Sequence, residues 1–238
     1  MAQRLLKTTG NENIDRILEE TVGALESLFP GRVRAVYLSG SYASADAVPT
    51  SDVDGLVVFR GDLTDEESRR FAVVIRSLSV LSGVFVDFVA RGERELLREG
   101  QYPTKAASRV LVYGDDVVAT VPAVPLWRYT TQTMQGSWFY LSLVRGGQDR
   151  LSFPLTYPDS RGEFFGYERN GLRSLDGWDR PGLKALVGEM TLAASTLVAM
   201  KAGVGIVRTV DSVTSYRTYV DDQWTNWLEE IYDRCKLS

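Results

Sequence analysis

The sequence predicts an α/β (α+β) fold, in which a small mixed-sheet domain over residues 1–121 is followed by a helical-bundle domain over residues 122–238. Three observations lead to this prediction. Strand and helix patterns alternate in the first half, Pro122 and Pro125 suit a linker, and helical periodicity dominates the second half. With 238 residues, of which 44 % are hydrophobic, the chain can form one large or two small folded domains.

Apolar strands alternate with amphipathic helices in the first half. Asn13 is expected to cap a helix over residues 13–29, which Pro30-Gly31 ends. The apolar run over residues 33–38 predicts a strand, and a second strand follows a polar loop and ends at residue 59. The alternation is completed by helices and strands over residues 62–82, 84–90, 92–99 and 109–113.

The second half is mainly helical. Apolar residues at helical spacing predict four helices, over residues 126–144, 182–202, 211–220 and 222–236. The segment over residues 146–180 is rich in glycine, aspartate and proline and is expected to be irregular.

Composition excludes several classes of protein. The formal charge of −4 makes tight nonspecific nucleic-acid binding unfavourable, so no stable nucleic-acid partner is expected. The chain has no histidine, which removes Ser-His-Asp and Cys-His catalysis and histidine metal sites. Cys235, the single cysteine, excludes an internal disulfide and suits a reducing compartment. No apolar run approaches the roughly 20 residues of a membrane span and no secretory signal is visible, so we expect a cytoplasmic protein without a membrane partner.

Three acidic residues carry the chemistry that the sequence suggests. Asp52 and Asp54 are two residues apart at the start of a strand, so both project to the same face. Asp87 lies within an apolar strand, where an unpartnered charge is costly to bury. If the two strands are neighbours, the three carboxylates form a cluster that a hard cation such as Mg²⁺ would neutralise.

Gly40 and Ser41 follow the strand over residues 33–38, and ten residues separate Ser41 from Asp52. At the start of the next element, they would present backbone N–H groups and a hydroxyl to phosphates. Each piece alone has a simpler interpretation, because Gly-Ser is often a turn and Asp-x-Asp often ends a strand. When hydrogen-bond donors for phosphate and carboxylates meet at one edge of a sheet, they indicate a phosphoryl or nucleotidyl transfer site.

Gly40-Ser41, the spacer and Asp52-Val53-Asp54 resemble the signature of the nucleotidyltransferase superfamily typified by DNA polymerase beta, and Asp87 matches its third acidic residue. The resemblance covers about residues 33–90. The strand over residues 109–113 is also similar to one in the antibiotic adenylyltransferase branch, whose members act on aminoglycosides and lincosamides. The resemblance implies Mg²⁺ as metal and ATP, or another nucleoside triphosphate, as co-substrate. It also implies Asp52, Asp54 and Asp87 as metal ligands and catalytic residues.

One departure from that branch concerns the triphosphate. Related enzymes often carry a Ser-Lys pair at the start of a late helix, whereas this chain has Arg208 in that region, which we expect to supply the cation. The base that accepts the proton of the acceptor is expected to be Asp87, with Glu189 in a later helix as the second choice.

Two classes of function remain open. The first is an enzyme that transfers a nucleoside monophosphate to a hydroxyl of a small molecule, such as an aminoglycoside-like antibiotic. The second is a nucleotidyltransferase-like antitoxin that binds or modifies a helical toxin partner. The appended helical domain favours the enzyme, and the charge disfavours a polymerase or a tRNA-end-adding enzyme. The sequence leaves open whether the protein is a monomer or a homodimer.

Overall fold

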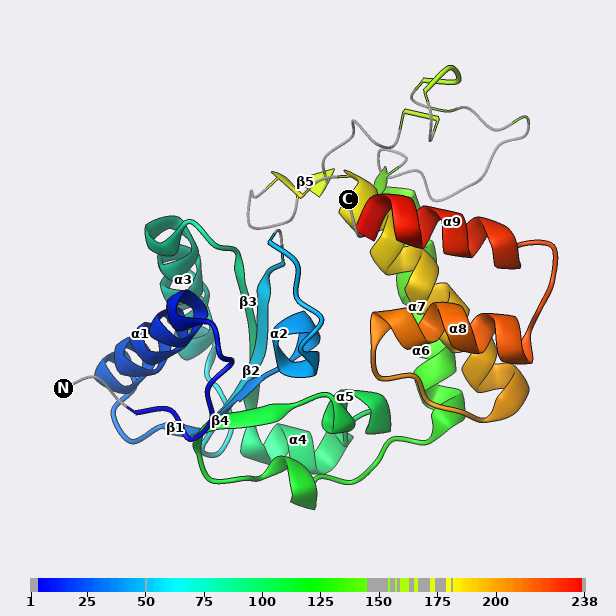
Figure 1. Cartoon of the computed structure of the whole chain (residues 1–238). Coiled ribbons are helices and arrows are strands. Elements are labelled where there is room, and N and C mark those ends of the chain that lie inside the picture. Colours follow the sequence, from blue (N-terminus) through cyan, green and yellow to red (C-terminus); the bar gives the residue numbers. More distant parts are fainter. Residues whose placement is uncertain are drawn as a thin grey trace. The chain divides into compact units, whose positions relative to one another are not determined.

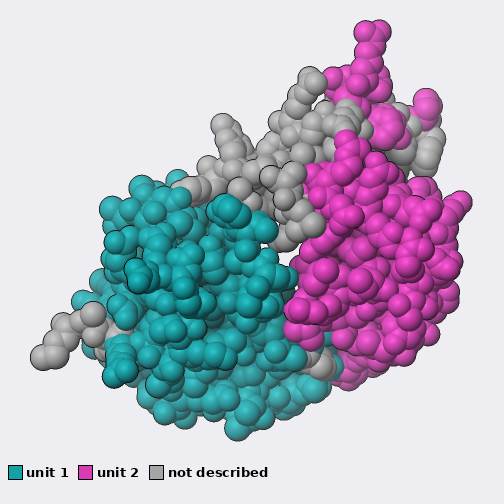
Figure 2. Space-filling view, viewed as in Figure 1, with its two compact units in different colours: residues 1–124 teal, residues 125–238 magenta. Residues whose placement is uncertain are grey.

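The computed structural model describes residues 4–49, 51–144, 154, 157, 159–162, 165–166, 172–173, 179–180 and 182–236. The chain divides into two compact units, residues 1–124 and 125–238 (Figure 2). The sequence predicts a boundary after residue 121, three residues earlier. Most of the predicted irregular segment over residues 146–180 lies outside the described residues.

The first unit is built on a four-stranded mixed sheet with strand order β3-β2-β1-β4 (Figure 1). Strand β1 pairs antiparallel with both β2 and β4, whereas β2 and β3 are parallel. The strands span Val33–Leu38 (β1), Val53–Phe59 (β2), Val86–Gly92 (β3) and Val110–Gly114 (β4). The helices of this unit are α1 (Glu12–Leu28), α2 (Gly40–Ser44), α3 (Asp65–Ser82), α4 (Glu93–Glu99) and α5 (Pro103–Ala107), with a 3₁₀ turn η1 (Val118–Thr120).

The two faces of this sheet carry separate apolar clusters. Helices α1 and α3 lie side by side on one face (Figure 1), where their apolar side chains bury Val36 and Leu38 of β1 and Val57 of β2. On the other face, Tyr37 and Leu56 pack with Leu96 of α4 and the η1 turn. Side chains alternate between the two faces along β2, as the period of two requires, whereas the pairings of β1 with β2 and with β4 each contain a register shift.

The second unit consists of helices α6 (Leu126–Val144), α7 (Gly182–Ala202), α8 (Thr209–Tyr219) and α9 (Thr225–Lys236). Its core lies among the last three helices and includes Val198 of α7, Tyr216 of α8 and Ile231 of α9. Two short antiparallel strands, β5 (Leu172–Arg173) and β6 (Asp179–Arg180), form a separate sheet. They fall where the sequence predicts irregular chain, because a strand of two residues carries no detectable periodicity.

The predicted fold class is confirmed: all strands of the main sheet end by residue 114, and the described chain after residue 125 is mainly helical. In the described part of the chain, no helix combines the length and the apolar character that a membrane crossing requires.

Local signals shift several predicted boundaries. The N-cap of α1 is Asn11 rather than the predicted Asn13, since the Asn11 side chain accepts hydrogen bonds from the backbone N–H groups of Asn13 and Ile14. Helix α3 starts three residues later than predicted because Thr64 and Glu67 form a capping box. Three short elements, α2, α5 and η1, were not predicted, because three to five residues are too few for helical periodicity.

Candidate active site

Two of the three predicted carboxylates are direct neighbours across the sheet. In the parallel pairing of β2 with β3, Asp54 lies in register with Asp87. The residues that precede them, Val53 and Val86, are 0 % and 2 % exposed in the core under α1 and α3. Asp54 and Asp87 therefore project from the opposite face, where both are half-buried. Neighbouring strands lie about 4.8 Å apart, so the two acidic side chains leave the sheet side by side.

Asp52 stands directly before β2, two residues from Asp54, and is half-buried. Its charge acts on Tyr42 of α2: burial, followed by the Asp52 carboxylate, raises the pKa of the Tyr42 hydroxyl. Tyr42 is not among the predicted site residues. No sequence pattern marks it, because it lies in α2, a helix of five residues that packs on β2.

Gly40 brings the Gly-Ser turn directly against Asp54. A Cβ atom at Gly40 would lie 2.1 Å from Oδ2 of Asp54, far inside van der Waals contact, and Gly40 has a φ of +66°. Both facts require glycine at this position. The backbone N–H of Ser39 also donates to the carbonyl oxygen of Asp54 at 2.9 Å, which fixes the start of α2 beside β2. The structure thus joins the two parts of the motif that lie fourteen residues apart in the chain.

Gly55 lets the neighbouring strand pack closely behind the carboxylates. A Cβ atom at Gly55 would lie 2.6 Å from the ring of Phe88 and 2.7 Å from the carbonyl oxygen of Tyr37. Phe88 itself is 6 % exposed and belongs to the core under α1 and α3. The strand positions that carry Asp54 and Asp87 are therefore fixed by tight packing on the opposite face of the sheet.

Ser41 is half-buried in α2, immediately after Gly40. Its carbonyl oxygen accepts from the N–H of Asp46, whereas its hydroxyl has no hydrogen-bond partner among the described residues. The first backbone N–H groups of a helix have no partner within the helix. Gly40 and Ser41 therefore present donors close to the carboxylate of Asp54.

The acidic residues do not make a complete metal site by themselves. Within the described ranges, no three acidic, histidine or cysteine side chains are gathered so that they could hold a metal ion. A cation bound by Asp52 and Asp54 would need further oxygen ligands, and the phosphate oxygens of a nucleotide are of the kind that Mg²⁺ prefers.

Two predicted site residues lie in the second unit. Arg208, at the N-cap position of α8, donates from Nε and Nη2 to Asp211 at 2.8 and 2.6 Å. Glu189 of α7 is half-buried, and its Oε2 has no hydrogen-bond partner among the described residues. Burial raises the pKa of Glu189.

Comparison with known proteins gives a family match over the first unit. The family model described as a nucleotidyltransferase domain matches residues 18–113. A candidate protein adenylyltransferase of Methanocaldococcus jannaschii is 33 % identical over 72 residues, which are 28 % of this chain and 72 % of that protein.

Solved structures of similar proteins are more distant in sequence. Spectinomycin adenyltransferase from Enterococcus faecialis, solved with ATP and spectinomycin, is 14 % identical, with a TM-score of 0.45, and the match covers 93 % of this chain and 98 % of that one. A toxin-antitoxin structure with AMP-PNP is 17 % identical, with a TM-score of 0.31, and the match covers 52 % of this chain and 90 % of that one.

Proposed function

Because the chain belongs to the nucleotidyltransferase family of the DNA polymerase beta-like superfamily, we propose that it transfers AMP from ATP to a hydroxyl group of a small molecule. The observation that carries this proposal is the contact of Gly40 with the Asp54 carboxylate, in register with Asp87 on the next strand. This arrangement brings hydrogen-bond donors suited to phosphate and acidic residues to one edge of the sheet. The adenylyltransferase named among the relatives supports AMP as the group transferred.

The carboxylates of Asp52 and Asp54 would hold Mg²⁺ together with phosphate oxygens of the nucleotide. Mg²⁺ bound there would neutralise phosphate charge and stabilise the leaving pyrophosphate. The Ser41 hydroxyl and the backbone N–H of Gly40 donate to phosphate oxygens, which positions the triphosphate on the carboxylate face of β2.

Asp87 is the proposed base. The acceptor oxygen attacks the α-phosphorus, the bond from that phosphorus to the bridging oxygen of pyrophosphate breaks, and the acceptor proton moves to the Asp87 carboxylate. Asp87 is half-buried and in register with Asp54, which supports a carboxylate rather than a histidine as the base. Glu189 is the second candidate for the base, because its Oε2 has no hydrogen-bond partner among the described residues.

The acceptor is proposed to be cationic, as aminoglycosides are, because the chain carries a net charge of −4 and its site is acidic. Arg208 is the proposed cation for the triphosphate. Its guanidinium now pairs with Asp211, so it would exchange a carboxylate for phosphate oxygens when nucleotide binds.

The test is a transfer screen. Each of the four nucleoside triphosphates, labelled at the α-phosphate, is incubated with the protein, Mg²⁺ and a panel of aminoglycosides and lincosamides. We expect label from ATP on one acceptor with wild type, and none with Asp54→Asn. Absence of transfer to every small molecule, with a stable complex and label on a helical toxin-like protein, would instead favour the antitoxin alternative.

A second experiment assigns the base. Asp87→Ala is expected to abolish transfer while MgATP still binds, whereas a pure metal ligand at this position would lose nucleotide affinity as well. Full turnover by Asp87→Ala, with loss of turnover in Glu189→Ala, would move the base to the second unit.

A further inference from the structure

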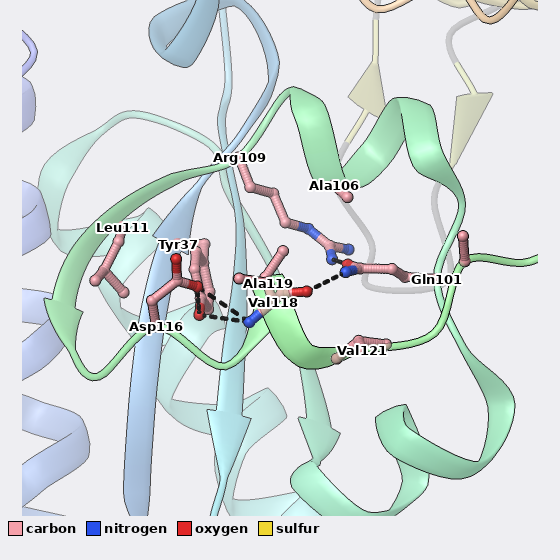
Figure 3. Close-up of a pocket in the computed structure, with 10 residues that line it drawn as sticks. Tyr37, Gln101, Ala106, Arg109, Leu111, Asp116, Val118, Ala119 and Val121 are labelled. Carbon is pink, nitrogen blue, oxygen red and sulfur yellow. Dashed lines mark hydrogen bonds between the residues drawn. The ribbon is translucent and has the colours of Figure 1, made fainter.

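A cavity of about 360 Å³ opens within the first unit (Figure 3). Tyr37 of β1 and Leu111 of β4 line it, and both side chains point to the same sheet face as Asp54. None of the three carboxylates proposed for catalysis belongs to its lining. The volume falls in the range of small-molecule sites, which measure roughly 300–1,000 Å³.

Arg109 supplies the cavity with a cation. It precedes β4, and its side chain extends into the cavity, where Nη1 donates to Oε1 of Gln101 at 2.7 Å (Figure 3). In the described part of the chain, no carboxylate forms an ion pair with Arg109, although nearby Arg91 pairs with two glutamates. Burial lowers the pKa of the Arg109 guanidinium, because it removes part of the water that solvates the cation.

The partner of Arg109 is fixed in place. Gln101 is 7 % exposed, and its Nε2 donates to the carbonyl oxygen of Val118 at 2.6 Å. Its backbone N–H donates to Pro122, and its carbonyl oxygen accepts from Val124. One N–H group of the Arg109 guanidinium therefore donates to a fixed amide oxygen. A guanidinium has several further N–H donors in the same plane. A preorganised cation of this kind loses little entropy when an anion binds.

At the opposite end of the cavity, the Tyr37 hydroxyl already has its hydrogen-bond partners within the protein. The Tyr37 hydroxyl donates to Oδ1 of Asp116 at 2.9 Å and accepts from the N–H groups of Val117 and Val118 at 2.7 and 3.1 Å. Burial, the largest cause, raises the pKa of Tyr37 to about 12, so this hydroxyl keeps its proton at neutral pH. Between the two ends the wall is apolar, with Leu111 and Val121 among its residues.

We propose that this cavity binds a small organic anion, whose carboxylate or phosphate group is held by Arg109 and whose apolar part packs on Leu111, Val118 and Val121. The charge of Arg109 has no anionic partner in the described structure, and the apolar wall offers no group to an inorganic ion. This site is additional to the proposed transfer site and does not depend on it. The competing explanation is that Arg109 only braces Gln101.

The test is a calorimetric titration of the whole protein with benzoate, phenyl phosphate and inorganic phosphate. We expect one organic anion at least to bind saturably with a stoichiometry of one, and the comparison of benzoate with phenyl phosphate identifies the preferred head group. Arg109→Gln is expected to weaken binding about tenfold or more, as the loss of a charge-assisted hydrogen bond implies. The matched control is Arg98→Gln, whose side chain is 65 % exposed on α4 and which should bind like wild type.

Two further variants keep the outcome decisive. Ala119→Leu adds a larger side chain to the cavity lining and leaves Arg109 intact, so we expect it also to weaken binding, even if Arg109→Gln fails to fold. Asp54→Asn should bind the organic anion normally, which separates this site from nucleotide binding. The proposal is overturned if neither organic anion binds saturably, if inorganic phosphate alone binds, or if Ala119→Leu and Arg109→Gln bind like wild type.

Discussion

Replacing Gly40 by alanine tests the geometry on which the proposed site depends. The new Cβ would stand 2.1 Å from Oδ2 of Asp54, whereas ordinary contacts begin near 3.4 Å, so the carboxylate has to move by about 1.3 Å. A misplacement of about 1 Å in a catalytic group can cost on the order of 10²-fold in rate. The φ of +66° adds backbone strain of about 1–2 kcal/mol for a residue with a side chain.

Gly83→Ala is the matched control. Gly83 ends α3 with a φ of +68°, and a Cβ there would have nothing within 4 Å, so this variant carries the same strain without touching a carboxylate. Both variants should melt about 2–8 °C below wild type, the shift that about 1–2 kcal/mol produces in a chain of this size. Only Gly40→Ala should lose Mg²⁺-dependent ATP binding, and its transfer rate on an identified acceptor should fall about 10²-fold.

The assays are thermal unfolding and a calorimetric titration of each variant with MgATP. If Gly40→Ala binds MgATP as tightly as Gly83→Ala, the Asp54 carboxylate does not act on the nucleotide, and the assignment of the site is wrong.

Three other predictions concern single side chains. Asp54→Asn should abolish Mg²⁺-dependent ATP binding in the titration. Its free energy of unfolding should change by less than about 1 kcal/mol, because the substitution removes one of two like charges on paired strands. A large loss of stability would contradict this prediction. Ser41→Ala should weaken MgATP binding about fivefold, the value of one hydrogen bond of about 1 kcal/mol, and an unchanged dissociation constant would remove the hydroxyl from the phosphate site. Burial raises the pKa of Glu189, so wild-type stability should fall as pH rises from the ordinary glutamate value of 4.5 through the raised pKa. Glu189→Gln should lose this fall in denaturant unfolding measured across pH, whereas Glu230→Gln, at an exposed position, should retain it.

Long periodic elements could be predicted from the sequence. The helices α6 and α7 and strand β1 match their predicted bounds, because each has an uninterrupted apolar pattern between clear stop signals. The common face of Asp54 and Asp87 also follows from strand periodicity once β2 and β3 are known to be neighbours. Elements of two to five residues, such as α2 and β5, could not be found in this way.

Features that depend on tertiary contact could not be predicted. The requirement for glycine at position 40 comes from the Asp54 side chain fourteen residues later, and no local pattern announces it. The cavity at Arg109 is of the same kind. It forms because Gln101 is tied to Val118 and to the backbone near residue 122, contacts that only the folded chain reveals.

The proposed transfer site is tested most directly by mapping where the nucleotide binds. Backbone amide chemical shifts of the protein are recorded by NMR while ATP is added, with and without Mg²⁺. We expect Mg²⁺-dependent shifts concentrated at residues 39–42, 52–55 and 86–88, and we expect Asp54→Asn to remove them. Shifts confined to other parts of the chain, or shifts that persist unchanged in Asp54→Asn, would contradict the proposed site.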